Sequence, residues 1–143
     1  MQDLQKLKVI IIGAGEVGAQ VAERFSEFNK VEVTLIERNP ERSAYVKSHI
    51  NCLHITGSAL EPRILKKAGI LTCDLFYAVT DSDEVNLLAC QLAQEMIKRE
   101  LVKLSGTASH NLEESAPQLE ISSNPNTHEL DPDIETPCAP LGE

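Results

Sequence analysis

The sequence predicts an α/β fold, in which helices pack on both faces of a doubly wound parallel sheet. Four short apolar runs alternate with stretches of helical period over residues 9–104. A glycine-rich turn joins the first run to the first helical stretch, and an acidic residue ends the second run. Because each strand is followed by a helix, right-handed crossovers should place the strands in the order 3-2-1-4.

The first strand and the turn after it are the most informative stretch. Residues 9–12 form an apolar run typical of a buried parallel strand, and residues 13–18 read Gly-Ala-Gly-Glu-Val-Gly. Gly13 permits a tight bend, Gly15 lets the backbone approach a pyrophosphate, and Gly18 lets the following helix pack closely. Amide groups at the start of that helix attract anions. The pattern predicts a Rossmann-like dinucleotide site, with a structural turn that binds no ligand as the alternative.

The second apolar run, residues 31–37, ends on an acid that suits this interpretation. Glu37 lies 19 positions after Gly18, close to the roughly 20 expected for a carboxylate that accepts hydrogen bonds from ribose hydroxyls. Between the two runs, residues 16–28 have helical period. The expected buried face of this helix carries Val17, Val21, Phe25 and Phe28.

Capping residues and glycines mark the other elements. We expect a helix over about 41–48, a strand at 51–56, a helix ending at Gly69, a strand at 75–79 and a long helix lasting into 98–104. The predicted caps are Asn39 with Pro40, Ser58 with Glu61, and Asp81 with Glu84. The long helix should stop at Gly106. Its expected apolar face carries Val85, Leu88, Ala89, Leu92, Ala93, Met96 and Ile97.

The composition changes after residue 104, which predicts two parts. Residues 1–104 form the expected dinucleotide-binding domain. Residues 105–143 hold eight acidic residues, no lysine or arginine, and five of the seven prolines. We expect this acidic stretch, rich in proline and serine, to be a disordered tail, which leaves open that the sheet is truncated after the fourth βα unit.

Charge and composition argue against several classes of function. The net charge of −9 opposes binding to nucleic acid. No apolar run has the length of a membrane helix or of a secretory signal, so we expect a cytoplasmic protein without membrane insertion. The four cysteines form no C-x-x-C pair. His49, Cys52 and His54 lie close in sequence, but no fourth ligand is placed by spacing, and we expect no metal site.

The chain resembles the regulator-of-potassium-conductance domain, also called the KTN domain, of Trk-system potassium-uptake regulators and potassium channel gating rings. The resemblance covers roughly residues 8–98. The matching stretches are residues 11–18, 35–38, 55–59, 68–70 and 78–90. The last of these, Ala-Val-Thr-Asp-Ser-Asp-Glu-Val-Asn-Leu-Leu-Ala-Cys, is the most specific, since a generic dinucleotide fold does not need it. Members of that family continue with two further strands, whereas the pattern here dissolves after about Leu104.

The resemblance implies a cytosolic regulatory subunit that binds NAD(H), or in some relatives ATP and ADP, and has no catalytic residues. It implies a membrane potassium transporter as partner, which would hold the protein at the inner face of the plasma membrane. The implied phosphate-binding residues are Gly13, Ala14, Gly15, Glu16, Val17 and Gly18. The implied roles elsewhere are Glu37 at the adenosine ribose, Arg38 at adenine or phosphate, Gly57, Ser58 and Ala59 at the adenine edge, and Thr80 and Glu84 on the far side.

Two alternatives to a regulatory subunit remain at this stage. One is a fragment of an NAD-dependent oxidoreductase, which would also need a substrate pocket and a general acid or base near the nicotinamide. The other is a truncated nucleotide-binding remnant that has no partner. The long helix has apolar residues beyond its core face, among them Leu87 and Leu104, and we expect it to form a homodimer or a higher homo-oligomer.

Overall fold

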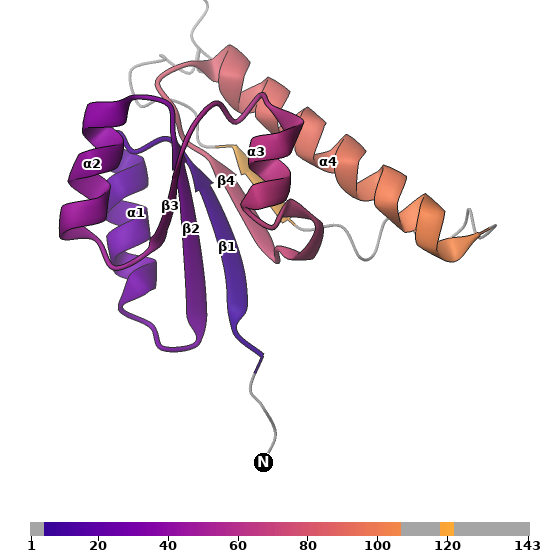
Figure 1. Cartoon of the computed structure of the whole chain (residues 1–143), viewed down its shortest axis with the longest axis horizontal. Helices are drawn as coiled ribbons and strands as arrows, with labels where there is room; N and C mark the ends of the chain where they lie inside the picture. Colours follow the sequence, from indigo (N-terminus) through magenta and orange to yellow (C-terminus); the bar gives the residue numbers. More distant parts are fainter. Residues whose placement is uncertain (1–4, 107–117, 122–143) are drawn as a thin grey trace, which may run out of the picture.

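The computed structural model describes residues 5–106 and 118–121 (Figure 1). Strands and helices alternate along the chain, as the sequence predicts. The strands are β1 (Leu7–Ile12), β2 (Val31–Glu37), β3 (Leu53–Thr56), β4 (Leu75–Ala78) and β5 (Gln118–Ile121). The helices are α1 (Glu16–Ser26), α2 (Pro40–His49), α3 (Pro62–Lys67), the short 3-10 turn η1 (Ile70–Thr72) and α4 (Asp83–Ser105).

All strand pairs of the sheet are parallel, and their order is β3-β2-β1-β4-β5. The predicted order 3-2-1-4 is confirmed for the first four strands. The carboxyl ends of β1 and β4 therefore lie side by side, at the point where the strand order reverses. In open α/β sheets this is where ligands bind.

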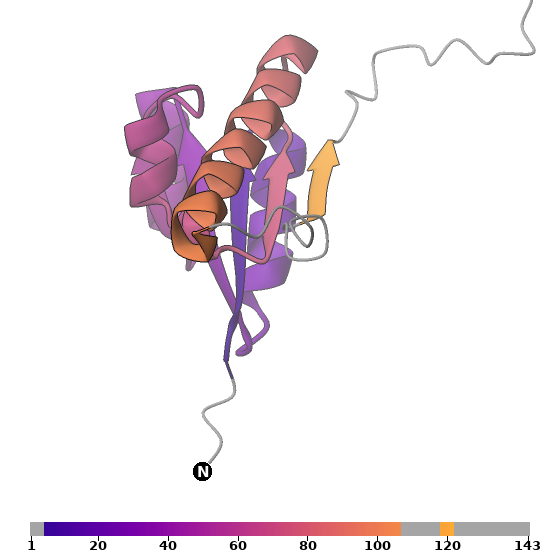
Figure 2. The same ribbon diagram turned by 90° about the vertical axis from the view of Figure 1, so that its right-hand side faces the viewer.

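A fifth strand extends the sheet beyond the fourth βα unit, a point that the sequence had left open, and it shows that residues 118–121 of the expected disordered tail form a strand. Strand β5 pairs with the outer edge of β4, from Leu75 opposite Gln118 to Ala78 opposite Ile121 (Figure 2). The amino-acid composition did not reveal this strand, because four residues change the average composition of a long acidic stretch very little. Its pairing partner β4, which is far away in sequence, supplies the hydrogen bonds. The other residues of the predicted tail lie outside the described residues.

Helices cover both faces of the sheet, with α1 and α2 on one face and α3 and α4 on the other (Figure 1). Alternate residues of β1 consequently enter two different cores. Val9 and Ile11 pack with Ala22 of α1, whereas Ile10 and Ile12 pack with the α3 and α4 side. Burial on both faces explains why the run is continuously apolar rather than alternating.

Helix α1 buries only part of the face that was predicted. Gly18 and Ala22 are its buried residues, while Val17 is 39% exposed and Phe28, beyond the helix end, is 59% exposed. Val21 and Phe25 are partly buried against the core, as expected. The close approach of Gly18 to the turn sets the rotation of the helix. Because neighbouring helical positions are about 100° apart, this rotation turns Val17 outward.

Of the three predicted helix caps, only the cap of α2 is confirmed. Asn39 caps α2, and its side chain accepts hydrogen bonds from the backbone amides of Glu41 and Arg42. The Ser58 and Glu61 box is wrong, because α3 begins at Pro62 and Ser58 Oγ instead accepts from the amide of Leu60. Proline at the first helical position explains the later start.

The cap of α4 is also corrected. Ser82, rather than Asp81, occupies the cap position, and its hydroxyl accepts from the amide of Val85. The Glu84 carboxylate accepts a hydrogen bond from Ser82 Oγ at 2.9 Å. Ser82 therefore takes the capping role predicted for Asp81, and Glu84 bonds the Ser82 side chain, while the Ser82 backbone amide donates to Thr80 Oγ1.

Helix α4 runs to Ser105 and stops at Gly106, which has a positive φ of 61°, as predicted. Its buried apolar residues are Ala89, Cys90, Ala93 and Ile97. Leu88, predicted to lie in the core, is instead 49% exposed, next to Leu87 at 50%. Over residues 5–106 and 118–121, no helix has both the length and the apolar character that crossing a bilayer requires.

Candidate functional site

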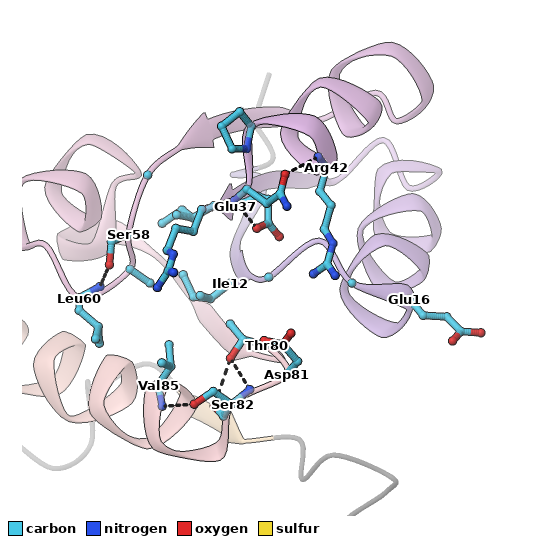
Figure 3. Close-up of a pocket in the computed structure, with 18 residues that line it drawn as sticks. Ile12, Glu16, Glu37, Arg42, Ser58, Leu60, Thr80, Asp81, Ser82 and Val85 are labelled. Atoms are coloured by element: carbon cyan, nitrogen blue, oxygen red, sulfur yellow. Dashed lines mark hydrogen bonds between the residues drawn. The ribbon is translucent and has the colours of Figure 1, made fainter.

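A cavity of about 690 Å³ opens at the carboxyl ends of the central strands (Figure 3). Four chain segments surround it: the β1–α1 turn, the β2–α2 turn with the start of α2, the loop after β3, and the β4–α4 loop. The lining residues are Ile12, Gly13, Gly15, Glu16, Ile36, Glu37, Arg38, Asn39, Pro40, Arg42, Gly57, Ser58, Ala59, Leu60, Thr80, Asp81, Ser82 and Val85. The segments that the sequence analysis assigned to a ligand thus meet at one place.

The three glycines of the β1–α1 turn have different structural roles. Gly13 has a φ of +96°, and a Cβ there would lie 3.0 Å from Thr80 Cα. A Cβ on Gly18 would lie 1.8 Å from the carbonyl oxygen of Gly13. Gly15 differs, since a Cβ there would meet nothing within 4 Å. Gly13 and Gly18 are therefore required by packing, whereas Gly15 faces open space in the cavity.

Helix α1 starts beside this open space. Gly15 is its N-cap residue, and no side chain caps the helix. The first amide groups of a helix have no partner within the helix and carry partial positive charge. This end of α1 can therefore accept an anion such as a phosphate.

The Glu37 carboxylate joins two of the turns that line the cavity. Oε2 accepts a hydrogen bond from the Ala14 amide at 2.6 Å, and Oε1 accepts from the Asn39 amide at 2.7 Å. The residue is 6% exposed. A carboxylate can accept about four hydrogen bonds, so Glu37 retains capacity for ribose hydroxyls. The Ala14 amide, expected at a phosphate, donates to Glu37 in this structure.

Asn86 holds the β4–α4 loop on the opposite side. This residue is fully buried, and its Oδ1 lies 2.9 Å from the Thr80 amide and 2.7 Å from Thr80 Oγ1. Its Nδ2 donates to the Thr80 carbonyl at 3.2 Å. One side chain thus fixes Thr80, which packs over Gly13 at the floor of the cavity.

Asn86→Ala is expected to destabilise the protein by about 1–3 kcal/mol, because the partly buried polar groups of Thr80 lose the buried amide that pairs with them. Urea denaturation followed by circular dichroism measures the change. Gln91→Ala, an exposed position on the same helix, is the control and should leave the stability within about 0.5 kcal/mol. Equal stability of the Asn86→Ala protein and the wild type would contradict a structural role for this amide.

The predicted site residues fall into two groups. Those that line the cavity are Gly13, Gly15, Glu16, Glu37, Arg38, Gly57, Ser58, Ala59 and Thr80. Those that do not are Ala14, Val17, Gly18 and Glu84. Ala14 and Gly18 are buried in the packing of the turn, and the Val17 side chain is exposed on α1. Glu84 is exposed in the first turn of α4; hydrogen bonds from its own backbone amide and from Ser82 lower its carboxyl pKa.

Arg42 is a cavity residue that the sequence analysis missed. It lies in the first turn of α2, two positions after Pro40. In Figure 3 its side chain runs from α2 toward the start of α1, while the Glu16 side chain points away from the other labelled residues. The Asn39-Pro40 start signal could have identified it, because the first turn of a helix that follows a strand lies at the carboxyl edge of the sheet.

Among the described residues, the cysteines and histidines (His49, Cys52, His54, Cys73 and Cys90) lie apart from the cavity lining. Within the described ranges, no group of three or more potential ligands is placed to hold a metal ion. His49 Nδ1 lies within hydrogen-bonding distance of the Tyr45 carbonyl and of Ser48 Oγ. Burial raises the pKa of Cys52 and of Cys73 to about 11, so both thiols are protonated at neutral pH.

Comparison with known proteins finds the same region in other chains. The TrkA-N domain family model matches residues 9–119. A Trk system potassium uptake protein TrkA from Halomonas elongata is 32% identical over 92 residues, and a TrkA homolog from Pyrococcus abyssi is 39% identical over 88 residues. These matches cover 64% and 62% of this chain but only 20% and 38% of those relatives.

A solved structure supports the fold as well. The RCK domain of GsuK superposes with a TM-score of 0.56 at 15% sequence identity. The superposition covers 83% of this chain and 26% of the GsuK chain. The arrangement of strands and helices is therefore that of a domain found within larger proteins.

Proposed function

Because the chain belongs to the TrkA-N domain family, we propose that it is a nucleotide-binding regulatory subunit of a potassium uptake system. The proposed ligand is NAD(H), with ATP or ADP as alternatives. One observation carries the proposal: the uncapped start of α1 and the open space at Gly15 line the same cavity as the Glu37 carboxylate. A phosphate acceptor and a ribose acceptor in one cavity suit a ligand that contains both groups.

The lining residues suggest how such a ligand lies. The diphosphate is expected at Gly15 and the α1 amides, and the adenosine ribose at Glu37. We expect residues 57–59 to face adenine and Thr80 to lie beside the remaining half of a dinucleotide, because both line the same cavity. NAD and ATP share the adenosine and the adjacent phosphates, so the same residues serve either ligand.

The hydrogen bonds of Glu37 favour a binding role over proton transfer. Each of its two carboxylate oxygens already accepts a hydrogen bond from a backbone amide, and these bonds hold the carboxylate in place. The relatives described above are named as potassium uptake proteins rather than as oxidoreductases. Both points support a sensing role, and we expect the protein not to be an enzyme.

The proposed partner is a membrane potassium transporter subunit, contacted from the cytoplasm. The names of the relatives support this partner. We also propose that the protein is a homodimer or a higher homo-oligomer. Helix α4 supports that state, since it exposes Leu87, Leu88, Val102 and Leu104.

Isothermal titration calorimetry of the purified protein with NADH, NAD, ATP and ADP in turn tests the proposal. We expect saturable binding of at least one of these ligands. In a parallel assay, NADH absorbance should stay constant with a panel of simple alcohols and aldehydes. A steady rate of NADH formation or consumption would support the oxidoreductase alternative instead, and failure to bind all four ligands would overturn nucleotide sensing.

A cellular assay distinguishes a regulatory subunit from the alternative, a nucleotide-binding remnant that has no partner. Deleting the chromosomal gene should change potassium uptake, and the wild-type gene should restore it. A protein that binds nucleotide but has no effect on uptake would support the remnant.

A further inference from the structure

Arg42 lines the cavity in a position that its neighbours hold in place. Its backbone amide donates to Asn39 Oδ1 at 3.3 Å, and the Asn39 amide donates to Glu37 Oε1 at 2.7 Å. The start of α2 is thereby tied to the carboxylate at the end of β2. From this fixed start the Arg42 side chain runs toward the β1–α1 turn (Figure 3).

The charge of Arg42 is not neutralised by any ion pair found within residues 5–106. The ion pairs in this range join Arg24 to Glu27, Arg63 to Glu61, Arg99 to Glu95 and Lys103 to Glu100. Glu37 lines the same cavity, but its two oxygens accept from backbone amides instead. An arginine guanidinium presents a planar fork of donors that matches two phosphate oxygens.

The start of α1 is a second source of positive potential in the cavity, besides the Arg42 side chain. The α1 amides point to the cavity without a capping side chain, and Gly15 leaves the approach open. The Arg42 side chain and the α1 amides belong to two different elements of the same cavity lining. A diphosphate can place one phosphoryl group at the α1 amides and the other at Arg42.

We propose that Arg42 is a phosphate-binding residue that makes the cavity select adenosine ligands with a diphosphate over AMP and adenosine. This inference rests on the proposed nucleotide-binding function and assigns it a residue and a ligand class. Arg38 also lines the cavity, directly after Glu37, and the diphosphate preference is assigned to Arg42 because its side chain runs toward the glycine turn.

Calorimetry with adenosine, AMP, ADP and NADH, on wild type, Arg42→Ala and Arg42→Lys, tests this assignment. Wild type should bind ADP and NADH more tightly than AMP, and AMP more tightly than adenosine. Arg42→Ala should weaken ADP and NADH binding by about 10- to 100-fold and leave adenosine binding unchanged. Arg42→Lys keeps the charge but loses the fork, so its ADP affinity should be intermediate.

Arg63→Ala is the matched control, because Arg63 lies outside the cavity lining and pairs with Glu61. It should leave all four affinities unchanged. Arg42 is exposed, so its variants should melt at the wild-type temperature. Raising the salt concentration should weaken ADP binding more in wild type than in Arg42→Ala.

The outcomes separate this inference from the function on which it rests. If wild type binds ADP and NADH and Arg42→Ala binds them equally well, only the role of Arg42 is overturned. An equal loss for adenosine and ADP in Arg42→Ala would also overturn it, since the residue would then not act on phosphate. If wild type binds none of these four ligands and neither NAD nor ATP, the proposed function and the inference both fail.

Discussion

Gly18→Ala is expected to lower the free energy of unfolding by about 3 kcal/mol or more, which is a large effect for one methyl group. The added Cβ would lie 1.8 Å from the Gly13 carbonyl oxygen and 3.0 Å from its carbonyl carbon. Both are backbone atoms of the β1–α1 turn, so no side-chain rotation can relieve the overlap. Either α1 or the turn has to move. Urea denaturation followed by circular dichroism measures the loss.

Gly15→Ala is the matched control for this prediction. A methyl group at Gly15 meets nothing within 4 Å, and the backbone φ of −68° suits alanine. Stability should therefore stay within about 1 kcal/mol of wild type. Nucleotide affinity should nevertheless fall, because the methyl group occupies the space of the phosphate. Equal stability of the two variants would contradict the division between packing and ligand roles of these glycines.

Glu37→Ala is expected to impair both folding and binding. The Ala14 and Asn39 amides lose a charged acceptor in a buried position, which should cost about 3 kcal/mol of stability. The affinity for NADH, or for whichever adenine nucleotide binds, should fall by a further amount equivalent to about 1–3 kcal/mol, since the ribose loses a charge-assisted hydrogen bond. Denaturation and calorimetry measure the two effects separately.

Two further variants sharpen the interpretation of Glu37. Glu37→Gln keeps one acceptor oxygen and the same size, so its stability should lie between wild type and Glu37→Ala. Glu32→Ala, an exposed position on the same strand, should change neither quantity. A stability loss with unchanged nucleotide affinity would remove Glu37 from the ligand site and leave it as a link between the two turns.

Because of the same carboxylate, we expect the protein to prefer NAD over NADP. Two acceptor groups, the Glu37 carboxylate and the 2′-phosphate of NADP, would meet at the ribose, so NAD should bind more tightly than NADP. Calorimetry of wild type with both cofactors gives the ratio. Tighter binding of NADP would mean that Arg38 and Arg42, which line the same cavity, outweigh Glu37.

Much of the fold could be predicted because its signals are local. Residues 9–12 are continuously apolar because β1 is buried on both faces, and this run identifies a central parallel strand before any partner is known. The strand order followed from connection rules rather than from contacts. Asn39 with Pro40 marked the start of α2 correctly because its capping hydrogen bonds lie within three residues.

Part of the site depended on distances that sequence spacing does not contain. The spacing predicted that Glu37 lies near the glycine turn. It did not predict the hydrogen bonds that the Ala14 and Asn39 amides donate to its carboxylate. The family resemblance implied Val17 and Gly18 at the phosphate, although Val17 lies outside the cavity lining and Gly18 is buried against the turn. The packing role that the glycine pattern predicted for Gly18 is confirmed. Arg42 was missed because its role depends on the direction in which α2 leaves the sheet.

The sequence by itself determined the βα order, the glycine turn and the acid at the end of β2, because each depends on backbone demands within a few residues. Only the tertiary structure decided which face of α1 is buried, which capping residue starts α4, and that β5 extends the sheet beyond β4. It also decided that Arg42 lines the cavity with the glycine turn. The physical reason is that these features depend on the rotation of helices and on pairing between segments far apart in the chain.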